Sequence, residues 1–131
     1  MSNSNENQTP PRIDPSLRTM AMPADTNANG DIFGGWVMSQ MDIAGSIPAV
    51  KKAKSRVATV AVTSMKFHKP VAVGDIVSVY TTSLKVGRTS ITVKVETWVE
   101  RAAIGETLKV TEAELVYVAI DADGNSQPVD R

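Results

Sequence analysis

The chain has 131 residues, 14 basic and 14 acidic side chains, and no cysteine. This length fits one domain with its own core, and the formal net charge of zero argues against the broad basic surface that binds nucleic acid or an anionic membrane. The absence of cysteine excludes disulfides, thiolate nucleophiles and cysteine-based metal sites.

The distribution of apolar residues argues against two further classes of protein. No apolar run approaches the roughly 20 residues that a membrane-spanning helix needs. The opening segment MSNSNENQTPPR has neither the basic start nor the apolar middle of a secretory signal. We therefore expect a cytoplasmic protein with no membrane and no nucleic acid among its partners.

The start of the chain is predicted to hold a tail, a short strand and a turn. Residues 1–16 are polar and proline-containing, and they bury too little apolar surface to offset their ordering entropy, so a disordered tail is expected. Residues 17–22 are expected to form an edge strand that Pro23 terminates. Segment 24–31 is rich in Asn and Asp and contains Gly, which is typical of a turn.

Residues 34–50 are predicted to form one helix. Val37, Met41 and Ala44 recur at spacings of four and three, which is the period of a helix with an apolar face. Further apolar residues widen this face, which predicts a helix buried on nearly all sides. Pro48 lacks an amide hydrogen and should kink or loosen the last turn.

The rest of the chain has the periodicity of strands, expected at 57–67, 76–85, 91–99 and 108–120. The first of them reads as a strand covered on both faces, and the last loses its alternation near Glu112, which suggests a bulge or an exposed edge. Strands joined by tight turns pair antiparallel, and such a sheet can curl around one helix. The sequence therefore predicts an α+β domain at 17–123 and a C-terminal tail at 124–131.

Asp42 is the single carboxylate of the predicted helix. One interpretation is a general base or nucleophile held among apolar groups. The other is a partly exposed Asp at the helix flank, hydrogen-bonded to Ser39 or Ser46, which lie three and four residues away. The residues alone leave both interpretations open.

The approach to this helix carries two more candidate groups. Gly34 and Gly35 stand where free amide donors and the positive end of the helix dipole can stabilise an oxyanion, although a Gly-Gly pair taken alone more often marks a turn or close packing. The carboxamides of Asn27 and Asn29 can orient a water or polarise a carbonyl. Turn or cap bonding is the better explanation for Asn29.

The connection between two predicted strands carries a cluster of polar residues and a glycine: Lys85, Gly87, Arg88, Thr89 and Ser90. Two cations, a glycine and two hydroxyls can hold phosphate through charge-assisted hydrogen bonds and backbone amides. A solvated hairpin tip is the usual role of such residues, and no strand–loop–helix context of a Walker loop surrounds them.

His68 is the only histidine. Beside Lys69 at a strand end, it is more often structural than catalytic, and alone it cannot form a multi-histidine metal site. No GxSxG motif supports serine–histidine–acid catalysis, and no metal or cofactor site is predicted.

Several segments resemble a known family, the hotdog-fold acyl-CoA thioesterases, and within it the bacterial YciA-type group. The longest are N-A-N-G-D-I-F-G-G-W at Asn27–Trp36 and M-S-Q-M-D at Met38–Asp42. Shorter matches are V-A-T-V-A-V at Val57–Val62, F-H-K-P-V-A-V-G-D at Phe67–Asp75 and K-V-G-R-T-S at Lys85–Ser90. The similarity runs from about Leu17 to Val129.

The resemblance implies a hotdog fold, an antiparallel sheet wrapped around one long central helix, and hydrolysis of acyl-CoA to a free acid and CoA without a cofactor. It implies a homodimer as the active unit, assembled as a trimer of dimers, with each active site between two protomers. Asp42 of one protomer would act as base or nucleophile, through activated water or a covalent anhydride. The partner's Asn27 would orient the water or the carbonyl.

The resemblance also implies how the substrate lies. The thioester carbonyl would face the amides around Gly35 and Trp36, with Phe33 and Gly34 beside it. Coenzyme A would run along the surface to segment 85–90.

Two other functions stay open on the residues. An acyl-thioester dehydratase or hydratase on the same fold usually needs a histidine paired with an acid, and His68 lies in neither the helix nor its entry turn. A non-catalytic acyl-CoA binding module would have less reason to bury an acid in its helix.

Overall fold

The computed structural model describes residues 9–131, so the first half of the expected tail 1–16 lies outside the described residues. The elements in chain order are β1 (Leu17–Met20), the short 3-10 helix η2 (Pro23–Asp25), α1 (Gly34–Ala53), β2 (Arg56–Phe67), β3 (Ile76–Val86), β4 (Ser90–Arg101), η3 (Ala102–Ile104) and β5 (Glu106–Ile120). Within this range, no helix is long and apolar enough to cross a membrane.

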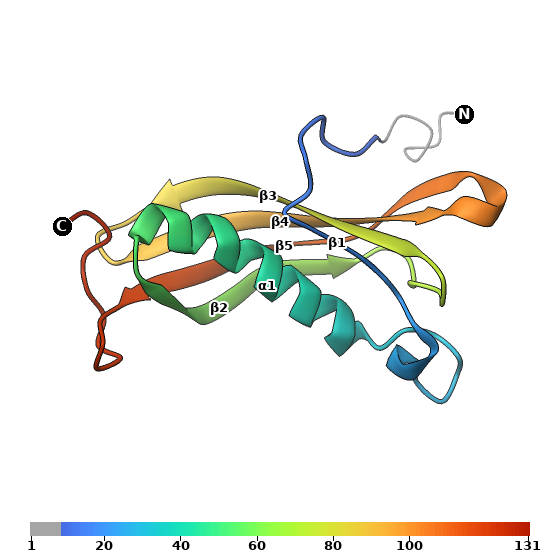
Figure 1. Cartoon of the computed structure of the whole chain (residues 1–131), viewed down its shortest axis with the longest axis horizontal. Coiled ribbons are helices and arrows are strands. Elements are labelled where there is room, and N and C mark those ends of the chain that lie inside the picture. The colour runs from blue at the N-terminus through green and yellow to red at the C-terminus, as the bar shows by residue number, and fades with distance from the viewer. Residues whose placement is uncertain (1–8) are drawn as a thin grey trace.

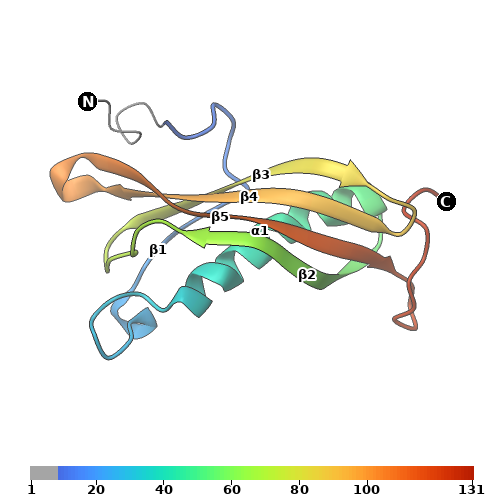
Figure 2. The same cartoon turned by 180° about the vertical axis from the view of Figure 1, so that it is seen from behind.

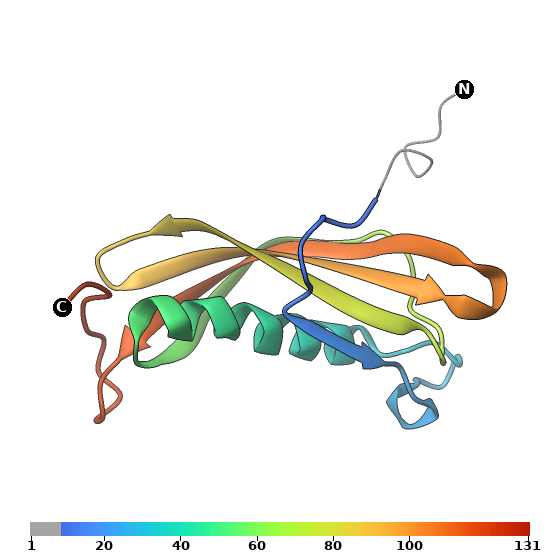
Figure 3. The same cartoon turned by 45° about the horizontal axis from the view of Figure 1, so that its top comes forward.

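Five strands form one antiparallel sheet in the order β1-β3-β4-β5-β2, and α1 lies along one face of it (Figure 1). Strands β3, β4 and β5 follow one another in sequence and lie side by side in the middle of the sheet. Strands β1 and β2 form its two edges. Seen with its top forward, the sheet bends over α1 and leaves the other side of the helix open (Figure 3). The predicted α+β architecture, with one helix against an antiparallel sheet, is confirmed.

The core lies between α1 and the sheet. Ile91, Val93 and Val95 of β4 are fully buried, because every second side chain of a strand points to the same face. Met41 and Ala44 of α1 belong to the same core and are also fully buried. The apolar face predicted from the spacing of three and four residues is therefore the face that packs on the sheet.

Two predictions about burial are wrong for the single chain. The helix is not buried on nearly all sides: Met38, Ile43 and Val50 are 39%, 51% and 42% exposed, since the one sheet covers only one side. Nor is β2 covered on both faces, because it lies at the edge of the sheet, and its Val60 and Val62 are 57% and 41% exposed. These five residues lie on neighbouring elements (Figure 2), and we refer to them as the apolar edge.

An irregularity interrupts β2 opposite Glu112. The register with β5 shifts between Thr63 and Lys66, and Ser64 has a left-handed backbone with φ of 56°. β5 also has one extra residue close to this point, because Thr97 pairs with Thr111 and Trp98 with Lys109, which leaves Val110 without a partner on β4. The slip predicted in the last strand near Glu112 is therefore confirmed. A bulge of this kind re-aims the side chains of an edge strand.

The far end of α1 is closed by the C-terminal segment. The helix continues past Pro48 to Ala53, and the Arg131 guanidinium donates to the Ala53 carbonyl oxygen at 2.9 Å. Val129 is buried, and its amide donates to the Arg88 carbonyl oxygen at 2.8 Å. Residues 124–131, expected as a tail, thus pack against the helix end and the β3–β4 connection.

Candidate active site

Asp42 lies about two turns into α1, and its carboxylate meets hydroxyl groups from β2 and β5. Its Oδ1 accepts hydrogen bonds from Thr59 Oγ1 at 2.6 Å and from the Tyr117 phenol at 3.2 Å. Ser39 and Ser46 instead donate to backbone oxygens three residues earlier in the helix. The interpretation in which a flanking serine holds Asp42 is therefore wrong.

The two oxygens of the Asp42 carboxylate differ in their surroundings. Among residues 9–131, Oδ2 has no hydrogen-bond partner, whereas Oδ1 has two. Asp42 also lines a pocket of about 170 Å³ between α1, β2 and β5. The apolar side chains of this pocket are Met38, Met41, Val62, Met65 and Leu115. One carboxylate oxygen is thus held by the protein, and the other is available beside an apolar pocket.

Tyr117 reaches the helix because residue 45 is glycine. The Tyr117 ring is fully buried, and its hydroxyl donates to the backbone oxygen of Asp42 at 2.7 Å. A Cβ added to Gly45 would lie 3.2 Å from two ring carbons of Tyr117. Burial, and then the negative charge of Asp42, raise the pKa of Tyr117 well above its ordinary value, so the phenol acts as a neutral donor.

The start of α1 presents free backbone donors. Phe33 is the N-cap residue and offers no side-chain cap, and its carbonyl oxygen accepts the amides of Trp36 and Val37 at 3.1 and 3.3 Å. The amides of Gly34 and Gly35 have no acceptor among the described residues. A Cβ at Gly35 would meet nothing within 4 Å, so another group can approach this backbone, whereas the Trp36 amide is already bonded.

Asn27 holds the preceding turn through its side chain. Its Oδ1 accepts the amides of Asn29 and Asp31 at 2.9 and 3.2 Å. Because the carboxamide oxygen is used in this way, its amino group remains as a donor. No hydrogen bond joins Asn27 to Asp42 among residues 9–131, so the single chain does not assemble these two groups into one site.

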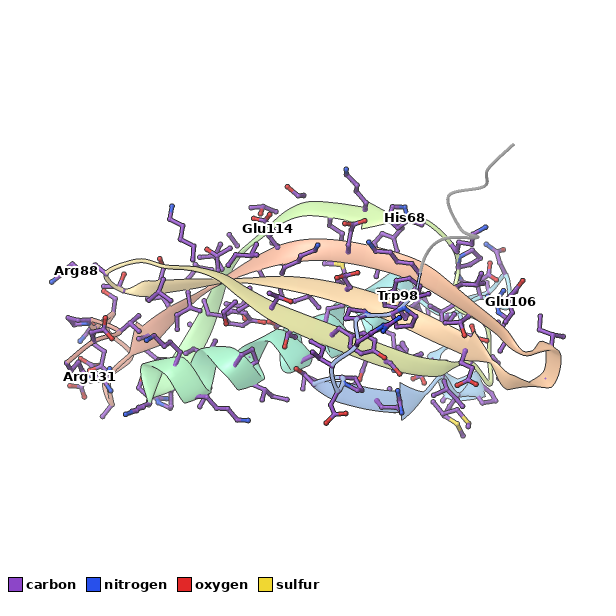
Figure 4. The ribbon with its side chains drawn as sticks, turned by 90° about the horizontal axis from the view of Figure 1, so that it is seen from above. His68, Arg88, Trp98, Glu106, Glu114 and Arg131 are labelled. Atoms are coloured by element: carbon purple, nitrogen blue, oxygen red, sulfur yellow. The ribbon has the colours of Figure 1, made fainter. Side chains whose placement is uncertain are left out.

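The β3–β4 connection lies at the opposite end of the molecule from the turn that precedes α1 (Figure 1). The Gly87 amide donates to the Ser90 carbonyl oxygen at 2.8 Å, which closes the predicted hairpin. Arg88 projects from this end, and Arg131 lies at the same end of the molecule (Figure 4). Within the part of the chain that the structure describes, Lys85 and Arg88 form no ion pair, and the single chain keeps them away from the helix entrance.

His68 has a partner, but it is not Asp42. Its Nε2 lies 2.9 Å from Glu112 Oε2, and Lys109 Nζ lies 3.1 Å from the same oxygen. The hydrogen bond with His68, together with Lys109, holds the pKa of Glu112 below its ordinary value despite some burial. His68, labelled in Figure 4, also lines a pocket of about 370 Å³ together with Gly34 and Val37 of α1. No group of three or more acidic, histidine or cysteine side chains in residues 9–131 could hold a metal ion.

The helix entrance, α1 and most of the sheet fall within a known sequence family. The profile named Thioesterase superfamily matches residues 29–105. The chain belongs to this superfamily. Its relatives include the acyl-CoA thioester hydrolase YciA of Salmonella typhimurium, 57% identical to this thioesterase over 116 residues, which cover 86% of this chain and 87% of the relative.

Solved structures confirm the predicted hotdog fold of the thioesterase. A hexameric broad specificity acyl-coenzyme A thioesterase superposes with a TM-score of 0.89 at 52% identity, covering 98% of this chain and 89% of that one. A hexameric hotdog fold thioesterase of Campylobacter jejuni superposes with a TM-score of 0.84 at 42% identity, covering 88% of this chain and 89% of that one.

Thr59 and Tyr117 were not predicted from the sequence as partners of Asp42. A signal exists for Tyr117: it falls on the inward phase of β5, where a buried phenol needs a hydrogen-bond partner. Thr59 lies in a strand rich in Thr and Val, and nothing local distinguishes it from its neighbours.

Proposed function

We propose that this thioesterase hydrolyses acyl-CoA to a free carboxylic acid and coenzyme A at a site between two protomers. The observation that carries the proposal is the Asp42 carboxylate, which has one oxygen fixed by hydroxyls and the other free beside an apolar pocket. A thioester carbonyl is already activated, so one base and a few well-placed donors suffice. Relatives named as acyl-CoA thioester hydrolases support this reading.

The groups at the site match the steps of hydrolysis. Asp42 takes a proton from a water molecule, whose oxygen bonds to the thioester carbon. The resulting oxyanion accepts hydrogen bonds from the free amides of Gly34 and Gly35. Collapse of this intermediate breaks the carbon–sulfur bond, and the departing thiolate receives the proton. A second route, in which Asp42 itself attacks and water then opens an anhydride, gives the same products.

A second copy of the chain would complete the site along the apolar edge. One side of β2 carries unpaired backbone groups, which can pair with another β2 and so continue the sheet. Antiparallel pairing about a twofold axis places the start of one β2 beside the end of the other. The hairpin end of one protomer then lies toward the helix entrance of its partner. The hexameric state of two structural relatives supports a trimer of such dimers.

The remaining candidate residues take roles that suit this arrangement. The partner's Asn27 donates its amino group to the thioester carbonyl, since its oxygen is occupied in the turn. Phe33 and Trp36 border the same entrance. Lys85 and Arg88 hold the phosphates of coenzyme A, and Gly87, Thr89 and Ser90 add backbone and hydroxyl donors. Coenzyme A is part of the substrate, and the reaction needs no cofactor.

The test is a thiol-release assay over acyl-CoA chain lengths with wild type and Asp42→Ala. We expect activity to fall by about 10²–10⁴-fold, the usual contribution of a general base, while the oligomer stays folded. Asp130→Ala removes an exposed carboxylate at the far end of α1 and should leave the rate unchanged. Full activity in the Asp42→Ala oligomer would refute the assignment.

Following the acyl-thioester itself beside thiol release separates the alternatives. Loss of the enoyl absorbance without thiol release would indicate a hydratase. Binding of acyl-CoA with no thiol release over time would indicate a binding module.

A further inference from the structure

We propose that Tyr117 is a positioning residue which, together with Thr59, fixes the Asp42 carboxylate so that Oδ2 is the oxygen that acts on water or on the thioester. This inference rests on the proposed function, because it assigns the reacting atom within the same site. It concerns a residue of β5, which is 75 positions away from Asp42 in the sequence.

The position of the phenol is set by the helix itself. The Tyr117 hydroxyl donates to the backbone oxygen of Asp42 at 2.7 Å and lies 3.2 Å from Oδ1 of the same residue. One proton is thus shared between two acceptors of one residue. Since the backbone oxygen cannot move without moving α1, the phenol fixes the side-chain oxygen relative to the helix axis.

Thr59 acts on the same oxygen from the other strand. Its Oγ1 donates to Oδ1 at 2.6 Å, which is the shorter of the two contacts with the carboxylate. Two donors from β2 and β5 converge on Oδ1 and oppose rotation of the carboxylate, because rotation would break both hydrogen bonds. Oδ2 is left as the oxygen without a protein partner among residues 9–131, and it is therefore the one free to accept a proton or to attack carbon.

Within residues 9–131, the pocket holds no other charged side chain that could orient the carboxylate. Among the described residues, the others that line the pocket around Asp42, from α1, β2 and β5, carry no ionisable side chain, and the neighbouring Tyr117 is neutral. The two hydroxyl donors therefore set the orientation of the Asp42 carboxylate. Removing one donor should let the carboxylate rotate, and hydrolysis should slow while substrate binding is retained.

A structural role alone would not require the hydroxyl. The ring of Tyr117 fills the core, and phenylalanine would fill the same space. Tyr117→Phe therefore removes the proposed function of the residue and retains its packing. The other tyrosine, Tyr80, is also buried, has no side-chain hydrogen bond within the described residues, and lies on β3, so Tyr80→Phe is a matched control.

The experiment measures kcat and KM for acyl-CoA hydrolysis in wild type, Tyr117→Phe, Tyr80→Phe and Asp42→Ala. For Tyr117→Phe we expect kcat to fall about 10-fold, the loss typical of a hydrogen bond to a charged group, with KM within about twofold. A fall in kcat at constant KM is the effect of losing an interaction that is made in the transition state. Tyr80→Phe should match wild type in both quantities.

The outcomes separate this inference from the proposed function. A folded Tyr117→Phe oligomer with wild-type kcat would overturn the positioning role, and so would a loss of activity confined to KM. Full activity of Asp42→Ala would instead overturn the proposed function. If Tyr117→Phe does not fold, the isosteric Thr59→Val at the exposed edge strand decides, because it must lower kcat at constant KM in the same way.

Discussion

Gly45 and Tyr117 face each other where β5 packs on α1, and a Cβ on the glycine would lie 3.2 Å from Cε1 and Cζ of the ring and closer still to the hydroxyl oxygen. The hydroxyl of the same ring reaches the Asp42 backbone at 2.7 Å. The glycine therefore controls how closely the last strand approaches the helix turn that holds the acid.

Gly45→Ala should destabilise the protein and reduce thiol release. Overpacking of a core costs about 1–3 kcal/mol, which exceeds the roughly 1 kcal/mol that alanine contributes in a helix interior. Gly35→Ala is the control for stability, because its Cβ would meet nothing within 4 Å. Denaturant unfolding measures the stability of both variants. A Gly45→Ala protein as stable as wild type would contradict the close packing.

The route of hydrolysis can be read from oxygen isotopes in a single turnover in H₂¹⁸O. If Asp42 activates water, the label should enter the acid product directly and Asp42 should stay unlabelled. If Asp42 forms an anhydride, the label can enter its carboxylate, which mass spectrometry of the peptide containing Asp42 would detect. The free Oδ2 permits both routes, and label in the Asp42 carboxylate would show that the anhydride forms.

Val60→Lys should weaken assembly and thiol release together. Val60 lies on the apolar edge and is 57% exposed, and a lysine on an edge strand opposes strand pairing. Val73→Lys, also at an exposed valine but outside the apolar edge, should leave both properties unchanged. Sedimentation velocity gives the oligomeric state, and a monomeric Val60→Lys protein with full activity would refute a site shared between protomers.

Arg101→Leu should cost about 3 kcal/mol of unfolding free energy. Arg101 Nε lies 3.2 and 3.3 Å from the two oxygens of Asp75, whose side chain is only 3% exposed. Removing one member of a buried ion pair leaves the other charge uncompensated. Lys52→Ala breaks a contact of 4.0 Å with the exposed Asp130 and should have no measurable effect. Equal stability of the two variants in denaturant would refute the distinction.

The Glu112 carboxylate should make stability depend on acid pH. Because the hydrogen bond with His68 lowers its pKa in the folded state, the unfolded state binds more protons in the window below the ordinary value of 4.5. The stabilisation is complete above that value and is lost as the pH falls through the folded pKa. Glu112→Gln and His68→Ala should both flatten this dependence in denaturant titrations, and an unchanged slope would contradict the contact.

Local patterns in the sequence predicted the elements and the position of the acid. The spacing of Val37, Met41 and Ala44 placed the helix, and alternation placed the strands, because both periods are properties of a few consecutive residues. The segment from Asn27 to Asp42 carried the family resemblance, which the Thioesterase superfamily profile and the relatives confirm. The roles of the individual site residues stay predictions.

Burial and long-range pairing were decided only in the tertiary structure. One side of α1 is exposed because a single sheet covers the helix. The apolar pattern of the helix does not show how many of its sides are covered. Thr59 and Tyr117 meet Asp42 across 17 and 75 positions, and such contacts depend on strand register. A slip of one residue would turn either side chain to the opposite face. The sequence by itself thus determined which acid occupies the helix, whereas the tertiary structure decided which hydroxyls hold it and which of its oxygens is free.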